Sequence, residues 1–264
     1  MTASKSKEMT FLDHLDELRK SLMRALAGLA VGVIACYFVS QYIQDFIIGF
    51  FRDQEGIQLA LLAPTEGFVV RLKISLVAGI FLSFPWILYQ LWLFVAPGLF
   101  AQEKKRVFPV IFFSSICFLT GASFAWFVLP WATTFFLSFS TPDIENMWSL
   151  GKYLDFVLRM FLAFGVVFEL PILIYFLARF GIVTPVFLRK YRRHSYIFVL
   201  IAAAIITPPD IFTQVILAMP MVILYEGSIF LAVLAEKRWQ QSLKSGLDST
   251  SDFTGDAAPN TGEN

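Results

Sequence analysis

Charged side chains are scarce in this sequence: they make up 16% of the 264 residues, whereas hydrophobic residues make up 57%. A soluble domain carries about 25% charged residues. The scarcity of charge therefore excludes an ordinary soluble protein, and the mean hydropathy of +0.68 indicates an integral membrane protein. The formal net charge of +1 gives no reason to expect a nucleic-acid partner.

Cysteine and histidine are equally scarce, with two of each in the chain. Cys36 and Cys117 each lie inside an apolar run, so the sequence offers neither a disulfide framework nor the ligand spacing of a metal site. We interpret both as small packed hydrophobes and expect no metal and no other cofactor. The chain also lacks the H-E-x-x-H and G-x-S-x-G motifs, and His14 and His194 stand at the edges of apolar runs. These absences argue against an intramembrane enzyme.

Long apolar runs are what the sequence does contain. A spanning helix needs about 20 mostly apolar residues, and five runs reach that length. A sixth run, from Tyr196 to Ile206, is shorter, but basic "RKYRRH" precedes it and "TPPD" with a full apolar run follows it. We therefore interpret residues 195–235 as a helical hairpin with a short first arm. The sequence predicts an all-α integral membrane protein with six transmembrane helices, over about 22–42, 74–96, 107–129, 154–178, 195–207 and 215–235.

Basic residues predict the orientation of these spans. Sixteen of the 21 Lys and Arg residues lie on alternate connections: the segment up to Arg24, residues 104–106, residues 179–193 and the tail. By the positive-inside rule these connections are cytoplasmic, so both termini are predicted in the cytoplasm. We expect a cytoplasmic amphipathic segment over 1–21, the six-span domain over 22–235 and a disordered cytoplasmic tail over 236–264. We do not interpret the first run as a cleaved signal, although "VIAC" (33–36) is similar to a lipoprotein cleavage box.

Prolines predict the shape of the spans. Pro85, Pro171 and Pro220 fall inside predicted spans, and Pro130 is predicted to end one. Each proline removes a backbone hydrogen bond and clashes with the preceding turn, so we expect curved helices that form a concave, glove-like bundle. The short arm from Ser195 to Thr207 gives only about 20 Å of helix, against about 30 Å of hydrocarbon. This mismatch predicts local thinning of the bilayer or cover by partners.

Two carboxylates are predicted near the cytoplasmic surface of the membrane, where basic residues are the usual choice. Glu17 belongs to "TFLDHLDELRKSL" (10–22), an amphipathic helix predicted to lie in the interface and then turn into the membrane. Glu103 directly precedes the three bases of residues 104–106. A carboxylate accepts a guanidinium in bidentate fashion, and a pair of carboxylates can hold two adjacent arginines. The alternative is that these acids are merely solvated.

Polar residues inside the predicted spans are the next candidates. Glu169 lies near the middle of the fourth span, where an ionisable group costs at least ~2.5–3.5 kcal/mol on insertion scales. It is either functional or a protonated side chain bonded to a neighbouring helix. Gln90 joins it in the predicted intramembrane polar site. Gln90 and Glu226 are weaker candidates than Glu169, because Gln often serves as a link between helices. Thr207 and Gln214 bracket the Pro-Pro turn and predict a polar patch at membrane depth.

Four long segments of the sequence carry a family resemblance: "FLDHLDELRK" at 11–20, "SFPWILYQLWLFVAPGLFAQEKKR" at 83–106, "FGVVFELPI" at 164–172 and "TPPDIFTQVILAMPMVILYE" at 207–226. In this order they resemble the TatC family of the twin-arginine translocase. The resemblance implies a core receptor in the bacterial cytoplasmic (inner) membrane that recognises the paired arginines of signal peptides on folded cargo. It also implies an oligomeric complex with the single-span partners TatB and TatA, in contact with lipid and driven by the proton-motive force.

The resemblance also implies roles for single residues. Glu17 and Glu103 correspond to acids that contact the signal peptide, and Phe94 is similar to a position tied to the same site. Glu169 is implied in a polar site on the concave surface, and Thr207 and Gln214 resemble the place where a partner's helix docks. Many members of the family carry a proline soon after the first span, in the first periplasmic loop. This chain departs from them, because it has no proline before Pro64.

A second class of function remains open at the level of the sequence. A proton-coupled small-solute transporter would use Glu169 as a proton relay. Such a protein is typically built from internal repeats and binds its substrate between broken helices at the membrane midplane. The sequence shows no internal repeat.

Overall fold

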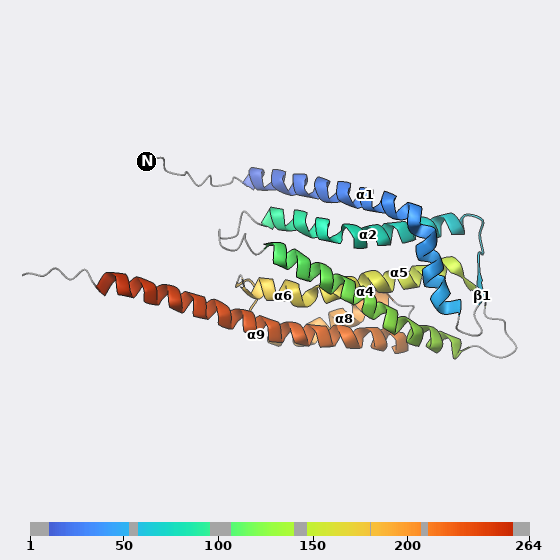
Figure 1. Ribbon diagram of the computed structural model, residues 1–264. Coiled ribbons are helices and arrows are strands. Elements are labelled where there is room, and N and C mark those ends of the chain that lie inside the picture. Colours follow the sequence, from blue (N-terminus) through green and yellow to red (C-terminus); the bar gives the residue numbers. More distant parts are fainter. Residues whose placement is uncertain are drawn as a thin grey trace, which may run out of the picture. The chain divides into compact units, whose positions relative to one another are not determined.

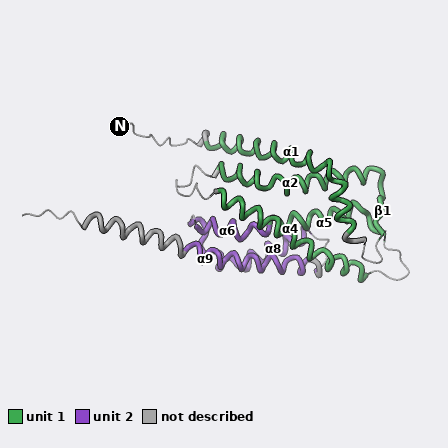
Figure 2. The backbone as a smooth tube through the Cα atoms, in the orientation of Figure 1, with its two compact units in different colours: residues 1–166 green, residues 167–264 purple. Residues whose placement is uncertain are grey.

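The computed structural model describes residues 11–52, 58–95, 107–139, 147–179, 181–206 and 211–255. Apart from two three-residue strands, the regular structure in these ranges is helical, and the chain divides into two compact units, residues 1–166 and 167–264 (Figure 2). Among the described residues, five helical segments are long and apolar enough to cross a membrane. They are His14–Gly49, Glu66–Phe94, Phe108–Leu137, Leu150–Arg179 and Gln214–Glu236.

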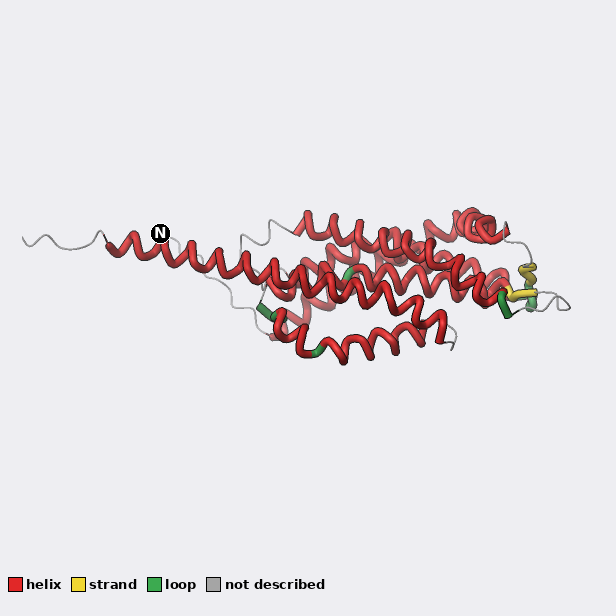
Figure 3. The backbone as a smooth tube through the Cα atoms, turned by 90° about the horizontal axis from the view of Figure 1, so that it is seen from below, coloured by secondary structure: helices red, strands yellow, loops and turns green. Residues whose placement is uncertain are grey.

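The first unit holds the first three of these segments and most of the fourth. Its elements are α1 (Phe11–Arg52), β1 (Gln58–Ala60), α2 (Glu66–Val95), α4 (Val107–Leu137), β2 (Met147–Ser149) and α5 (Leu150–Phe168) (Figure 1). The strands pair in parallel, with Gln58 opposite Met147 and Ala60 opposite Ser149. In Figure 3 this small sheet lies beyond the ends of the helices. It pairs the connection before α2 with the connection before α5.

The second unit contains α6 (Leu170–Arg179), α7 (Pro185–Lys190), α8 (Arg192–Ile206) and α9 (Ile211–Gly255). Helix α8 has 15 residues, which agrees with the short arm predicted from the sequence. Helix α9 is longer than its predicted span. The tail from residue 236 was predicted to be disordered, but α9 continues as a helix to Gly255. The sequence "EKRWQQSLK" (236–244) is rich in residues with good helix propensity, which explains this continuation.

Helix α1 joins the amphipathic segment and the first span without a break. The predicted turn between them near residue 22 is therefore wrong, because α1 runs from Phe11 to Arg52. Nothing in its sequence ends it sooner, since the first proline of the chain is Pro64. Figure 1 shows that α1 instead has a bend in its C-terminal part.

Small residues let α1 and α2 approach closely. A Cβ atom on Gly28 would clash with the Trp86 ring, and one on Gly79 would lie 2.8 Å from the backbone nitrogen of Val33. The Ser83 hydroxyl donates a hydrogen bond to the Gly28 carbonyl across the contact (3.1 Å). Small-residue contacts of this kind replace the hydrophobic effect as the source of helix association in a membrane. We call this contact the α1–α2 seam.

Aromatic rings fill much of the remaining interior of the first unit. Phe118 of α4 is buried and stacks on Phe84 of α2, with ring centroids 3.8 Å apart. Farther along α4, Phe124 meets the buried Phe164 of α5 edge to face at 5.4 Å. Some of the 30 phenylalanines of the chain therefore serve packing between helices.

The prolines act in two different ways. Pro130 was predicted to end a span, and this is wrong, because α4 continues through Pro130 to Leu137. Pro171 interrupts the fourth span, so that α5 ends at Phe168 and α6 begins at Leu170. Pro171 has no amide hydrogen for the Val167 carbonyl, and its ring clashes with that carbonyl. The break leaves Glu169 between two helices.

Candidate functional site

Glu17 lies on the side of α1 that faces α2. It shares a helical stripe with Ser21, Ala25 and Gly28, all partly buried, and Gly28 belongs to the α1–α2 seam. The Glu17 oxygen Oε2 is shielded from solvent and has no hydrogen-bond partner among the described residues. An acceptor in this state is costly unless a donor from elsewhere reaches it. Glu17 therefore places a carboxylate oxygen without a donor from the described residues at the end of the seam.

An aromatic stack closes the same end of the seam. The His14 ring on α1 and the Phe94 ring on α2 are stacked, with centroids 4.5 Å apart and planes 22° apart. His14 is three residues before Glu17, so the two side chains lie on one face of the helix. The structure thus brings Phe94 to the same turns of α1 as Glu17. Sequence analysis missed His14 as a neighbour of the site, although its three-residue spacing from Glu17 was a usable signal.

Asp16 shows what a solvated acid looks like in the same segment. Its carboxylate lies 3.4 Å from the Lys20 ammonium, and the two side chains are 61% and 65% exposed. Exposed pairs of this kind contribute little to stability. The interpretation of the segment's acids as merely solvated therefore suits Asp16 but does not suit Glu17.

Glu103, the second predicted carboxylate, lies outside the described residues, as do the three bases that follow it. Helix α2 ends at Val95, which directly follows Phe94 and leads into the connection that carries Glu103. The stack of His14 and Phe94 therefore marks the side of the seam from which this connection departs.

The two predicted intramembrane polar residues fall in different compact units. Gln90 on α2 is only 2% exposed, and its Oε1 has no hydrogen-bond partner in the described part of the chain. Glu169 is partly buried at the break between α5 and α6, and its carbonyl accepts a hydrogen bond from the Leu173 amide (2.9 Å). Both are polar groups at positions where apolar residues surround them in the sequence.

Of the two residues predicted to meet a partner helix, Thr207 lies outside the described residues. Gln214 is partly buried near the start of α9, and its Nε2 donates a hydrogen bond to the Leu200 carbonyl of α8 (3.0 Å). This bond ties the two arms of the predicted hairpin together.

Sequence analysis did not predict the ion pair between Lys73 of α2 and Asp155 of α5. The Lys73 ammonium lies 2.7 Å from both carboxylate oxygens, and the side chains are 43% and 29% exposed. The two residues are 82 positions apart, so no local pattern could have indicated the contact.

The hydrogen bonds of Glu66 are a second set of contacts that the sequence did not indicate. Its carboxylate accepts hydrogen bonds from the amides of Leu62 (2.5 Å) and Ala63 (3.2 Å) in the turn before α2. It also accepts from the Ser149 hydroxyl (2.5 Å) and the Gly151 amide (2.7 Å) at the start of α5. One side chain thus holds together the first turns of two helices and the end of β2.

A third polar cluster lies in the second unit. The Arg192 guanidinium of α8 lies 2.7 Å from Glu226 Oε2 of α9, and the Tyr196 hydroxyl donates to the other oxygen of Glu226. Glu226 thus links α8 and α9, a contact that the sequence did not predict.

A comparison with protein families matches residues 13–220 to the family described as Sec-independent protein translocase protein (TatC). Proteins named "Sec-independent protein translocase protein TatC" are similar over most of the chain. The one from Desulforapulum autotrophicum is 38% identical over 261 residues, covering 96% of this chain and 97% of the relative. The one from Helicobacter pylori strain J99 is 40% identical over 220 residues, covering 83% of this chain and 87% of the relative.

Solved structures give the same result. A crystal structure described as "Twin Arginine Translocase Receptor- TatC" is 36% identical, with a TM-score of 0.78 over 84% of this chain and 99% of the solved one. A second crystal structure of that receptor, in DDM, has a TM-score of 0.76. The helical arrangement described above is therefore the fold of that receptor.

Proposed function

This chain belongs to the TatC family of Sec-independent protein translocase proteins, and from this premise we propose that it is the subunit of a twin-arginine translocase that receives the signal peptide. The resemblance found in the sequence is thereby confirmed. The chain is a component of a translocase and not an enzyme.

The observation that carries the proposed binding site is the unfilled oxygen of Glu17. Its Oε2 lies at the end of the α1–α2 seam, where the described residues supply no donor. A guanidinium of the signal peptide supplies two parallel N–H donors in the geometry that a carboxylate accepts. The site is therefore built for a ligand that brings its own donors.

The aromatic stack beside Glu17 supports an arginine ligand over a lysine one. The rings of His14 and Phe94 stack on each other one turn of α1 from Glu17, and an outer face of this stack would offer a flat surface to the ligand. A guanidinium stacks on such surfaces, whereas the compact ammonium of lysine does so less well. Glu103 then acts as the second carboxylate, so that each arginine of the pair has its own acceptor.

The remaining proposed features concern the assembly. With α8 counted as the short span, the chain crosses the bacterial cytoplasmic (inner) membrane six times and keeps both termini in the cytoplasm. TatB and TatA are the proposed partners for transport driven by the proton-motive force. Gln214 and Thr207 are the proposed contacts of a partner helix, and Glu169 and Gln90 the proposed intramembrane polar site.

One feature matches the transporter alternative, which requires a broken helix at membrane depth. The break between α5 and α6 at Glu169 has this form. Pro171 accounts for it on local grounds, and membership of a translocase family favours the receptor.

Binding of a fluorescent twin-arginine signal peptide to the purified protein in detergent tests the proposed site. Glu17→Gln removes the charge and half of the bidentate acceptor, so we expect the dissociation constant to rise roughly tenfold, which corresponds to about 1.4 kcal/mol. A twin-lysine peptide should lose a similar factor with the unchanged protein.

Asp16→Asn is the matched control, because it removes one acid from the adjacent position of the same helix. Asp16 faces solvent beside Lys20, so this variant should bind the twin-arginine peptide as the parent protein does. Equal weakening by both substitutions would reduce the site to a diffuse negative patch. Unchanged binding in Glu17→Gln would remove Glu17 from the site.

A further inference from the structure

A group of basic side chains lies at the junction of α7 and α8 in the second unit, and none of them is a residue proposed to bind the peptide. The sequence from 170 to 209 holds five bases and no acid. Arg192 is paired with Glu226 on α9. Arg189, Lys190 and Arg193 are exposed and form no ion pair with any residue that the structure describes. We call these three residues the junction bases.

Large apolar side chains are exposed on the same surface. Val186 is 73% exposed, Phe187 51% and Tyr191 40%. The Lys190 ammonium lies 5.9 Å from the centroid of the Tyr191 ring, which in turn lies 4.6 Å from that of Phe187. Bases that alternate with exposed apolar groups are typical of a helix in a membrane interface, not of one facing water.

Two hydrogen bonds place the α7–α8 junction beside Tyr225 and Glu226 of α9. The Tyr225 hydroxyl donates to the Leu188 carbonyl of α7 (3.0 Å), and Arg192 at the start of α8 bonds to Glu226 (2.7 Å). The next charged residue of α9 is Glu236, ten residues beyond Glu226, and the residues between them are apolar or small. Ten residues of helix span about 15 Å.

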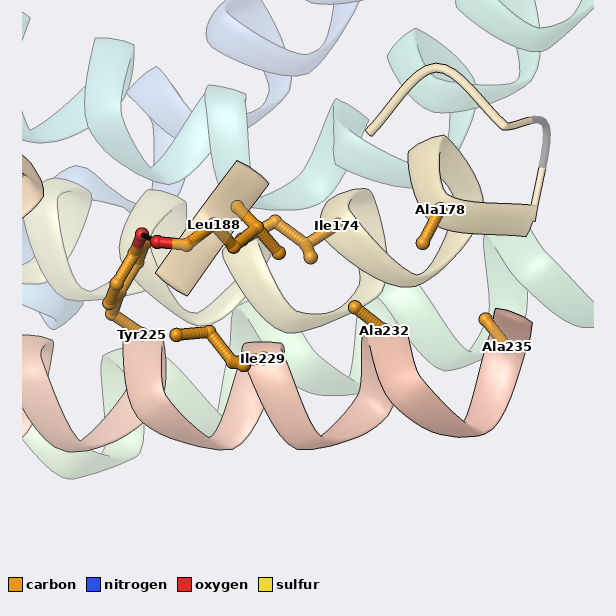
Figure 4. Packing of buried hydrophobic residues seen from close by; sticks show 7 residues of the cluster. All are labelled: Ile174, Ala178, Leu188, Tyr225, Ile229, Ala232 and Ala235. Atoms are coloured by element: carbon orange, nitrogen blue, oxygen red, sulfur yellow. Dashed lines mark hydrogen bonds between the residues drawn. The ribbon is translucent and has the colours of Figure 1, made fainter. Parts of the chain in front are cut away.

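The path of the chain explains how bases reach this level. Helix α6 ends at Arg179, and Gly181, with φ of 70°, allows the chain to reverse. Figure 4 shows Ala178 and Ala235 at one end of the buried cluster and Leu188 and Tyr225 at the other. The chain therefore returns along α9 before α7 begins, and it carries the junction bases back with it.

We propose that the junction bases bind the phosphate of an anionic phospholipid whose headgroup is drawn in to the α7–α8 junction. Three uncompensated positive charges beside apolar sequence need a negative partner at that level. Val186 and Phe187 would contact the acyl chains of the same lipid. A soluble anion would meet the charges but leave these apolar side chains uncovered, so the surface fits a lipid better.

Native mass spectrometry of the delipidated full-length protein, titrated with phosphatidylglycerol and with phosphatidylcholine, tests this site. We expect the parent protein to prefer phosphatidylglycerol by at least about tenfold, because each base near a headgroup contributes roughly a fivefold factor. The triple variant Arg189→Gln, Lys190→Gln, Arg193→Gln should lose this preference. Inorganic phosphate should not displace the lipid.

The matched control removes the same number of bases from the tail, as Lys237→Gln, Arg238→Gln, Lys244→Gln, and should keep the preference. Equal lipid binding by the junction variant and the parent would overturn the site. Equal loss in both triple variants would show that net charge alone attracts the lipid. Displacement by inorganic phosphate would make it a soluble-anion site. If the triple variant does not fold, Lys190→Glu alone tests the same prediction, because that side chain is exposed and forms no ion pair with a described residue.

Discussion

Four acids of the first unit show that the surroundings of a carboxylate decide what it does. Asp16 forms a solvent-exposed ion pair with Lys20. Asp155 binds the Lys73 ammonium between α2 and α5, and Glu66 accepts hydrogen bonds from backbone amides and a hydroxyl group. Glu17 has an oxygen that no described donor reaches. Its chemistry is the same as that of the others, so its position at the end of the α1–α2 seam is what makes it a candidate for ligand binding.

The Lys73–Asp155 pair allows a prediction about single residues. Asp155→Asn should lower the free energy of unfolding by about 1 kcal/mol or less, because the pair is only partly buried. Lys73→Gln should have a similar effect. The double variant should lose clearly less than the two single losses together, since either substitution already breaks the pair. Thermal unfolding of the four proteins in one detergent measures this. Strict additivity would mean that the two side chains do not interact.

At the scale of elements, the contact between α1 and α2 depends on the absence of side-chain volume. Gly79→Ala would place a methyl group 2.8 Å from the backbone of Val33, which a rotamer change cannot relieve. We expect this variant to lose about 1–3 kcal/mol of stability through overpacking. The measurement is again the thermal midpoint in detergent.

Gly49→Ala is the control for that substitution. Gly49 also lies within α1, but a Cβ atom there would have nothing within 4 Å. Alanine should leave stability unchanged or raise it by up to about 1 kcal/mol, because it restricts the unfolded chain and favours helix. If both alanine variants lowered the midpoint equally, the close approach at Gly79 would not be the cause.

Glu66 links three elements, and its loss should be felt in all of them. In Glu66→Gln an amide group replaces one acceptor oxygen, and its N–H donors would then face donors from the protein. Hydrogen exchange should therefore speed up at the amides of Leu62, Ala63 and Gly151. Ser149→Ala removes only one of the four donors and should produce a smaller change. Exchange rates equal to those of the parent protein in Glu66→Gln would show that the strand pair holds these turns without it.

At the scale of the whole molecule, the number of spans is decided by α8. In the described ranges five helical segments meet the length for a span, and the 15-residue α8 does not. Six crossings place both termini on one side of the membrane, and five place them on opposite sides. We expect a compartment-sensitive reporter fused at each terminus to give the cytoplasmic signal in both cases, with the opposite signal from a reporter inserted at residues 207–210. Termini on opposite sides would exclude α8 as a span.

The sequence by itself determined that the protein is an all-helical membrane protein and to which family it belongs. These follow from apolar run length, the distribution of bases and long ordered motifs, which are properties of the chain read in order. It also singled out Glu17, because an acid in a segment predicted to be cytoplasmic is conspicuous without any coordinates. The bounds of the helices were less accurate: the structure carries α4 through Pro130 and extends α9 past residue 236, because proline and polar composition only bias a helix to end.

Only the tertiary structure decided which residues meet. Three contacts join residues that are distant in sequence: His14 stacks on Phe94, Lys73 pairs with Asp155, and Tyr225 of α9 bonds to Leu188 of α7. Such contacts arise when packing brings together side chains on separate helices. The periodicity of the sequence predicts only which face of its own helix a residue occupies. The sequence therefore named the carboxylate, and the packing of α1 on α2 left one of its oxygens without a donor from the described residues.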